Sequence, residues 1–208
     1  MAGEIRADRL SYDRLRSLSE DFLRAQHPSG KIPVPIEDIV EFKLKLDIVP
    51  VSGLRDALRV DGHGVDGYLS GDRTAIHVDE YVYEKVPNRY RFTLAHEVGH
   101  WVLHDHVYRN RQYKNVAEWK AFVNAIDDET HRWLEWQAYA FGGLVLVPTG
   151  ELRSRFDGAL AKLEQCGINP SDCPQYAFDQ MVDSLADEFE VSSDVILRRL
   201  KYEKFVGE

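Results

Sequence analysis

The most informative stretch of this sequence reads Arg91-Phe-Thr-Leu-Ala-His-Glu-Val-Gly-His100-Trp-Val-Leu-His104. Its apolar residues recur at three- and four-residue intervals, and Pro87 and Asn88 just before it are typical of a helix start. We therefore predict a helix from Asn88 onward. Within that helix, residues 96–100 fit the pattern H-E-x-x-H, whose chemical meaning depends on a helical context.

The spacing of His96 and His100 favours a shared metal ion. Side chains four residues apart on a helix lie one turn apart on the same face, so both imidazoles can reach one zinc ion. Glu97 projects beside them, where a carboxylate can take a proton from a water activated by the metal. The pattern thus predicts His96 and His100 as metal ligands and Glu97 as a catalytic general base.

A catalytic zinc site needs a third protein ligand, and the two nearest histidines fit that role poorly. His104 lies two turns beyond His96 and is rotated by about 80° around the helix, which hinders a shared tetrahedral site. His106 has the spacing of the metzincin pattern, but that pattern requires a glycine where this sequence has Leu103. The third ligand is therefore expected further along the chain.

Glu135 is the favoured third ligand. It lies in a second predicted helix, over residues 130–147, and Ala138 and Gly142 form a stripe of small residues beside it. A glycine inside a helix costs about 1 kcal/mol relative to alanine, so Gly99 and Gly142 are best explained as packing contacts. Close packing of the two helices would bring the Glu135 carboxylate to the zinc ion.

Two stretches of the sequence match one known family closely. The helix quoted above is close to R-F-T-L-A-H-E-x-G-H-x-x-L-H, and Glu135-Trp-Gln-Ala-Tyr-Ala-Phe-Gly-Gly-Leu-Val-Leu-Val-Pro148 is close to E-x-x-A-N-x-F-A-x-x-L-L-x-P. Both are patterns of the ImmA/IrrE family of zinc metallopeptidases, which the sequence resembles. The segment Val65-Asp-Gly-Tyr-Leu also resembles the hairpin that usually precedes the motif helix, and together these similarities cover about residues 32–148.

The resemblance implies a gluzincin-like peptidase in which His96, His100 and Glu135 bind Zn²⁺ and Glu97 is the general base. Members of the family are typically bacterial or phage proteins. The best understood cleave a helix-turn-helix repressor, which releases a stress response or mobile-element genes. Some members have no demonstrated protease activity, so the alternative function is a non-catalytic zinc-binding regulator that acts by binding protein or DNA.

The sequence departs from the family pattern at Tyr139, where the family usually has an asparagine that supports a ligand. His131, one turn before Glu135, is a further candidate for a supporting or replacement ligand. Tyr68, Tyr139 and His104 are all candidates for stabilising the developing oxyanion, and the sequence does not choose among them.

The remaining periodicity predicts an α+β fold. Helices are expected over residues 8–26, 36–42 and 119–126, and the proline in the apolar run of residues 46–51 favours an edge strand or the end of a strand. Turn residues 70–73 join two short apolar runs, 65–69 and 74–78, into a hairpin. We therefore expect a small antiparallel sheet packed on a helical, zincin-like core.

The chain is expected to divide near residue 150. Residues 1–150 would form the zincin-like metallopeptidase domain with its N-terminal helix, and residues 151–208 a C-terminal helical region resembling a helix-turn-helix. The C-terminal segment contains many acidic residues, whereas binding to phosphate groups requires a positive surface. DNA is therefore not an expected partner of this region, and packing or docking of a protein substrate is favoured.

Composition narrows the class of protein further. The 208 residues carry 26 Lys and Arg against 35 Asp and Glu, a net charge of −9 that argues against broad binding to nucleic acid or to an anionic membrane. No stretch approaches the roughly 20 consecutive apolar residues of a membrane span, and the N-terminus lacks the apolar core of a signal peptide. A cytoplasmic protein is expected, with Cys166 and Cys173 as reduced thiols.

Overall fold

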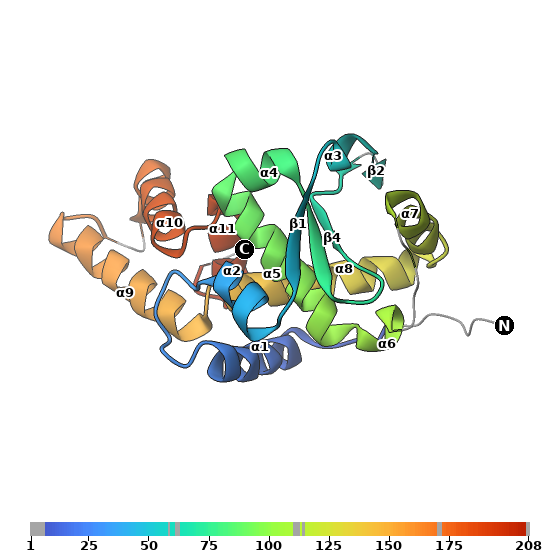
Figure 1. Ribbon diagram of the computed structural model, residues 1–208. Coiled ribbons are helices and arrows are strands. Elements are labelled where there is room, and N and C mark those ends of the chain that lie inside the picture. The colour runs from blue at the N-terminus through green and yellow to red at the C-terminus, as the bar shows by residue number, and fades with distance from the viewer. Residues whose placement is uncertain are drawn as a thin grey trace.

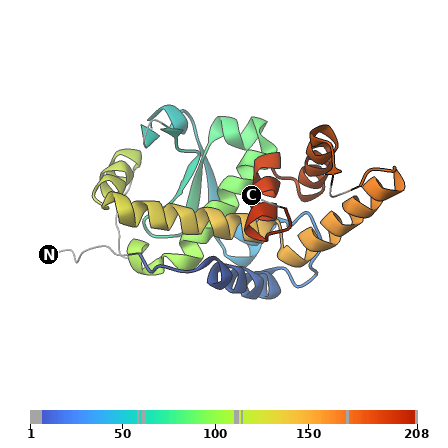
Figure 2. The same ribbon diagram turned by 180° about the vertical axis from the view of Figure 1, so that it is seen from behind.

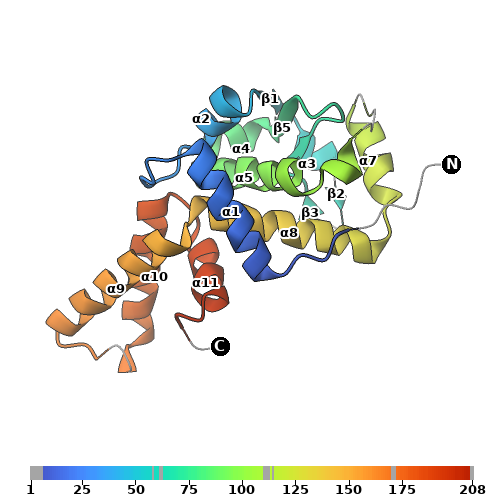
Figure 3. The same cartoon turned by 90° about the horizontal axis from the view of Figure 1, so that it is seen from below.

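The computed structural model describes residues 7–57, 59–60, 63–109, 113, 115–169 and 172–206 of the chain. Its main part is layered: a small sheet packs on helix α5 (Pro87–Leu103), and α8 (Asp128–Leu146) packs on the other side of α5 (Figure 1). Helix α1 (Tyr12–Gln26) lies against α8, as the view from below shows (Figure 3). The two helices predicted to carry the metal ligands are therefore neighbours at the centre of the fold.

Three short strands form the main sheet, in the order β1–β5–β4. Strand β4 (Gly67–Leu69) pairs antiparallel with β5 (Ala75–Asp79), which confirms the predicted hairpin, and β1 (Asp47–Val51) is an edge strand as its proline indicated. The prediction of an antiparallel sheet was wrong, because β1 pairs parallel with β5. More than 20 residues separate these two strands, and such a connection is long enough for a parallel crossover.

The other elements are short around the sheet and longer in the C-terminal half. Near the sheet lie α2 (Ile36–Asp38), the π-helix η1 (Ile39–Lys43), α3 (Leu54–Ala57), the strand pair β2 (Arg59–Val60) and β3 (His63–Gly64), α4 (Glu80–Lys85) and α6 (Asp105–Tyr108). After these come α7 (Val116–Asn124), α9 (Thr149–Gln165), α10 (Gln175–Phe189) and α11 (Ser193–Tyr202). Figure 2 shows α8 crossing the back of the molecule, with α7 at one end and α9 and α10 at the other. Helix α4 was not predicted from the sequence, and α9 falls within the expected C-terminal helical region without having been predicted as a separate helix.

One hydrophobic cluster joins residues from both ends of the chain. It contains Leu94 and Val98 of α5, Phe141 of α8, Phe156 of α9 and Leu200 of α11, all buried. The C-terminal helices thus pack on the same core as the motif helix. The expected division near residue 150 stays a prediction.

Helices α5 and α8 approach each other closely at two glycines. A Cβ atom added at Gly99 would lie 2.9 Å from both the Cα and the carbonyl oxygen of Ala138. A Cβ atom at Gly142 would lie 3.1 Å from the backbone nitrogen of His96. The structure therefore confirms that Gly99 and Gly142 are packing contacts between the two helices.

Helix α11 is anchored by a buried arginine. The Arg199 guanidinium donates to the carbonyl oxygen of Val147 at 3.1 and 3.2 Å and to the Thr149 hydroxyl at 2.9 Å, and it pairs with Glu203 at 2.5 Å. Arg199 is only 3% exposed, so these protein groups, and not water, satisfy its charge.

None of the helices in the described ranges combines the length and the hydrophobicity that a membrane span requires.

Candidate metal centre

Helix α5 holds His96 and His100 one turn apart on the side that faces α8. The helix begins at Pro87, whose fixed φ and missing N–H suit the first helical position. It ends at Leu103, so both histidines lie well inside the regular helix. This rigid segment sets the spacing of the two imidazoles before any other contact is made.

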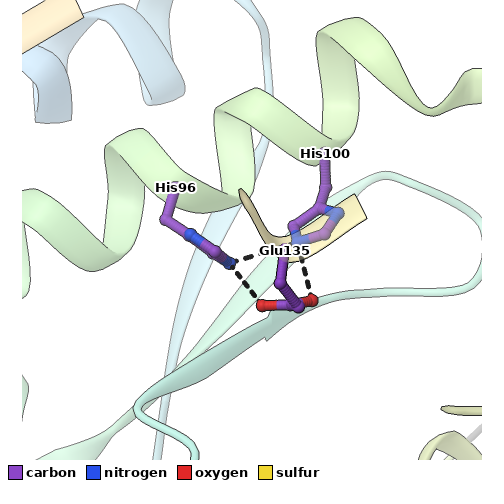
Figure 4. A group of neighbouring side chains, drawn as sticks. All are labelled: His96, His100 and Glu135. Carbon is purple, nitrogen blue, oxygen red and sulfur yellow. Dashed lines mark hydrogen bonds and ion pairs between the residues drawn. The ribbon is translucent and has the colours of Figure 1, made fainter. Parts of the chain in front are cut away.

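Glu135 of α8 meets these two imidazoles (Figure 4). The two Nε2 atoms of His96 and His100 are 3.1 Å apart, and each lies 3.3 Å from one Glu135 carboxylate oxygen. The ligand atoms of these three side chains all lie within 4.8 Å of one another. Within the described part of the chain, they form the one group of His, Cys, Asp or Glu side chains that could hold a metal ion. The structure thus brings together the residues that the sequence nominated as ligands.

The separations of these donor atoms fit a tetrahedral zinc site. With zinc–ligand distances of about 2.0–2.1 Å, neighbouring ligands of a regular tetrahedron lie about 3.3 Å apart. The 3.1 Å between the two imidazole nitrogens and the 3.3 Å from each nitrogen to a different oxygen of the Glu135 carboxylate are close to that value. Two imidazoles and one carboxylate are also a common ligand set of catalytic zinc, so these residues fit the ion.

The carboxylate and the histidines shift each other's protonation. Partial burial would raise the pKa of Glu135, but the neighbouring imidazoles of His100 and His96 hold this pKa well below its ordinary value. Burial would lower the pKa of His96, and the Glu135 carboxylate outweighs it, so this pKa is raised. Glu135 is therefore ionised at neutral pH, which is the form that can bind a cation.

Glu97 lies on the same helix, next to the first histidine, and is almost fully buried. Burial raises the pKa of its carboxyl group, and the histidines His96 and His100 oppose that shift. The backbone N–H of Leu69 donates a hydrogen bond to this carboxylate. Glu97 therefore points toward strand β4 and has a proton affinity above that of an exposed glutamate.

The other candidate ligands lie outside this group. His104 is buried on the far side of His100, with its Nδ1 atom 3.0 Å from the Nδ1 atom of His100. Burial lowers the pKa of His104 to about 2, so its imidazole is neutral. His106 is exposed, and the Nε2 atom of His131 lies 3.7 Å from Oε1 of Glu135 but is not one of the three converging donors.

The candidate oxyanion donors are also separated by the fold. His104 is hydrogen-bonded within the core, and Tyr139 packs on Phe92 with ring centroids 4.7 Å apart. Tyr68 lies on β4, where it stacks on His77 and contacts Trp119. Of the three, Tyr68 is the one on the strand that borders Glu97.

Two buried polar residues near the histidines were missed by the sequence analysis. Gln137 and Tyr108 contact His104 and His100. One signal was present: Gln137 lies on the same face of its helix as Leu134 and Phe141, where an amide is unexpected. Its partner His104, which directly follows α5, lies 33 residues away and could not be identified from spacing.

Two histidines and a carboxylate are a ligand set that metal-dependent peptidases use. A comparison with protein families also supports the class of metallopeptidases. The family model Peptidase_M78, described as the IrrE N-terminal-like domain, matches residues 68–201. The chain therefore belongs to this family, which supports a metallopeptidase and confirms the resemblance to ImmA/IrrE proteins.

A solved structure gives a second comparison, which concerns the fold alone. It is described as a Mycobacterium tuberculosis transcriptional regulator and has a TM-score of 0.52 and 16% sequence identity to this chain. The similarity covers 91% of this chain and 49% of that one, so this chain spans about half the length of that protein. No curated protein matches the chain significantly.

Proposed function

We propose that this protein is a zinc-dependent endopeptidase. The observation that carries the proposal is the convergence of two imidazole nitrogens and one carboxylate from α5 and α8, with separations that fit zinc. In this proposal His96, His100 and Glu135 are the three protein ligands, and the fourth position stays open, as catalytic zinc requires.

Glu97 is the general base in the proposed reaction. Bound zinc supplies polarisation of the scissile carbonyl and lowers the pKa of a water toward ~7. The Glu97 carboxylate accepts a proton from that water and later donates it to the leaving amine. Its burial beside the two histidines supports this role, because the carboxylate lies next to the proposed ligands and away from bulk water.

An extended peptide would bind along strand β4. Among the described residues β4 pairs with β5 alone, and its other edge faces Glu97 at Leu69. The Leu69 carbonyl oxygen at this edge accepts from the Tyr113 hydroxyl at 2.6 Å, so an added peptide strand would replace that contact. Strand addition would therefore bring a peptide bond close to the general base. By its resemblance to ImmA/IrrE proteins, the proposed substrate is a helix-turn-helix repressor in a stress-response or mobile-element switch, which places the activity in the cytoplasm.

The proposed two-part organisation assigns the C-terminal helices to substrate docking or packing. Helices α10 and α11 are separated by a short segment that begins with Glu190, a residue in the left-handed conformation. Arg199 faces the core rather than solvent and cannot reach a phosphate backbone. Its burial removes one positive charge from this segment, although Arg198, Lys201 and Lys204 stay exposed, and the acidic balance of the whole chain favours a protein partner over DNA.

The decisive experiment combines metal analysis with a cleavage assay. The purified chain is incubated with the product of a neighbouring gene that encodes a helix-turn-helix protein. Glu97→Gln should keep zinc and lose cleavage, whereas His96→Ala and His100→Ala should lose both. Glu164→Gln, an exposed change on α9, is the matched control and should behave like the natural chain.

Each outcome separates the proposal from its alternative. Full turnover by the Glu97→Gln variant would refute the general-base role, and undiminished zinc in either histidine variant would refute the site. If the natural chain binds zinc and the repressor without cleaving it, and Glu97→Gln binds equally well, the non-catalytic regulator is the correct function.

A further inference from the structure

A chain of buried polar side chains continues behind His100, away from the proposed ion. The Nδ1 atom of His100 lies 3.0 Å from Nδ1 of His104, and Nε2 of His104 lies 3.3 Å from Oε1 of Gln137. The Gln137 amide nitrogen then lies 2.5 Å from the backbone carbonyl oxygen of Asp8. His104 and Gln137 are each 1% exposed, so water does not replace these contacts.

The direction of every hydrogen bond in this row of side chains follows from the Asp8 carbonyl oxygen at its end. The carbonyl oxygen of Asp8 can only accept, so the amide nitrogen of Gln137 donates to it. The amide oxygen of Gln137 therefore faces His104 and accepts from it, which places the His104 proton on Nε2. In a neutral imidazole the other nitrogen, Nδ1, is then an acceptor.

The same logic fixes the tautomer of His100. Because Nδ1 of His104 is an acceptor, the Nδ1 atom of His100 carries the proton and donates to it. The Nε2 atom of His100 is then left with its lone pair, directed toward His96 and Glu135. The opposite tautomer would place a hydrogen on Nε2 and abolish its capacity to bind a metal. The Tyr108 hydroxyl oxygen, 3.2 Å from the same Nδ1 atom, is a second acceptor.

We propose that His104 and Gln137 are positioning residues that hold His100 in its metal-binding tautomer and ring orientation. This inference rests on the proposed function, in which His100 is a ligand. Hydrogen bonds to the second nitrogen of a ligating histidine are known to tune metal sites. The printed contacts of the His100 Nδ1 atom are with His104 at 3.0 Å and with the Tyr108 hydroxyl at 3.2 Å, whereas Tyr139 packs on Phe92.

The inference links the N-terminal segment to the metal centre. Asp8 is 129 positions away from Gln137 in sequence, yet its carbonyl oxygen sets the direction of the whole chain of hydrogen bonds. The segment between residue 7 and α1 therefore contributes to the site through its backbone. Neither partner has a local sequence pattern that predicts this contact.

The first test measures zinc affinity by competition with a chelator. His104→Leu removes the nearer of the two acceptors for the His100 Nδ1 proton, leaves the Tyr108 hydroxyl, and should weaken zinc binding about 10- to 100-fold. His104→Asn places an amide oxygen near the position of the lost Nδ1 atom and should restore much of that loss. Leu144→Ala, a buried change on α8 that touches none of these hydrogen bonds, should lower the unfolding temperature and leave zinc affinity unchanged. Equal zinc affinities for His104→Leu and the natural chain would overturn the inference.

The second test observes the tautomers directly. Long-range ¹H–¹⁵N NMR spectra of the zinc-loaded, ¹⁵N-histidine-labelled protein should show His104 protonated on Nε2 and His100 protonated on Nδ1. A His104 proton on Nδ1, or on both nitrogens, would overturn the inference while leaving the ligand assignment intact. If the natural protein does not bind zinc, or if His100→Ala binds zinc as well as the natural protein does, the proposed function is rejected instead.

Discussion

Replacing Gly99 by alanine tests whether close packing of α5 and α8 builds the metal centre. The new Cβ atom would lie 2.9 Å from the Cα and oxygen of Ala138, both backbone atoms that no rotamer change can move. Restoring an ordinary contact distance requires the two helices to separate by about 0.5 Å. Since His96 and His100 lie on one helix and Glu135 on the other, this separation changes the geometry of the site directly.

The expected magnitudes differ for folding and for metal binding. Overpacking costs about 1–3 kcal/mol, and the better helix propensity of alanine returns about 1 kcal/mol, so the metal-free variant should lose at most about 2 kcal/mol of unfolding free energy. Metal–ligand distances tolerate errors of only about 0.2 Å. Gly99→Ala should therefore weaken zinc binding at least about tenfold, the lower limit for disturbed ligand support.

Urea unfolding of the metal-free protein and chelator competition measure these two quantities. Gly158→Ala is the matched control, because Gly158 lies inside α9 and an added Cβ atom there meets nothing within 4 Å. This control should gain about 1 kcal/mol and keep its zinc affinity. If Gly99→Ala gains stability like the control and binds zinc as tightly as the natural chain, the packing explanation of the site is wrong.

Three further predictions concern the same fold. Glu203→Gln leaves the buried Arg199 charge without its ionic partner and should cost about 3 kcal/mol in urea unfolding at pH 7; no loss would show that Val147 and Thr149 suffice. Burial alone would raise the pKa of Glu203, but pairing with Arg199 lowers this pKa in the folded protein. The ionised Glu203 carboxylate therefore stabilises the fold fully above the unfolded-state pKa of about 4.3, and this stabilisation is lost as the pH falls through the lower folded-state pKa. The unfolding free energy should thus fall less steeply with acidification in Glu203→Gln than in the natural chain, and identical slopes would contradict this assignment. Free zinc at 100 times its Kd should stabilise the protein by about 2.7 kcal/mol, which calorimetry detects as a higher Tm; His96→Ala should remove this shift, and a shift that persists would exclude His96 as a ligand.

Gln137 illustrates what the tertiary structure adds to a sequence pattern. Its position on the α8 helix is predictable from local periodicity, but its two hydrogen-bonding partners lie 33 and 129 positions away. Only the packed structure shows that His104 occupies the place behind His100.

Local periodicity, with its start and stop residues, was sufficient for the helix that begins at Pro87, for the hairpin of β4 and β5 and for the helix that carries Glu135. The spacing of His96, Glu97 and His100 also follows from one helix alone, because four residues make about one turn. These features depend on residues that are close together in the sequence, so the sequence alone is enough to predict them.

Features that depend on distant segments were decided only by packing. The parallel pairing of β1 with β5 could not be read from strands whose own patterns fit either direction. Convergence of Glu135 with the two imidazoles requires α5 and α8 to approach until Gly99 touches the backbone of Ala138. The sequence nominated that carboxylate by the small residues around it, but the distance between the helices is set by side-chain volumes across the whole interface, which no single stretch of sequence contains.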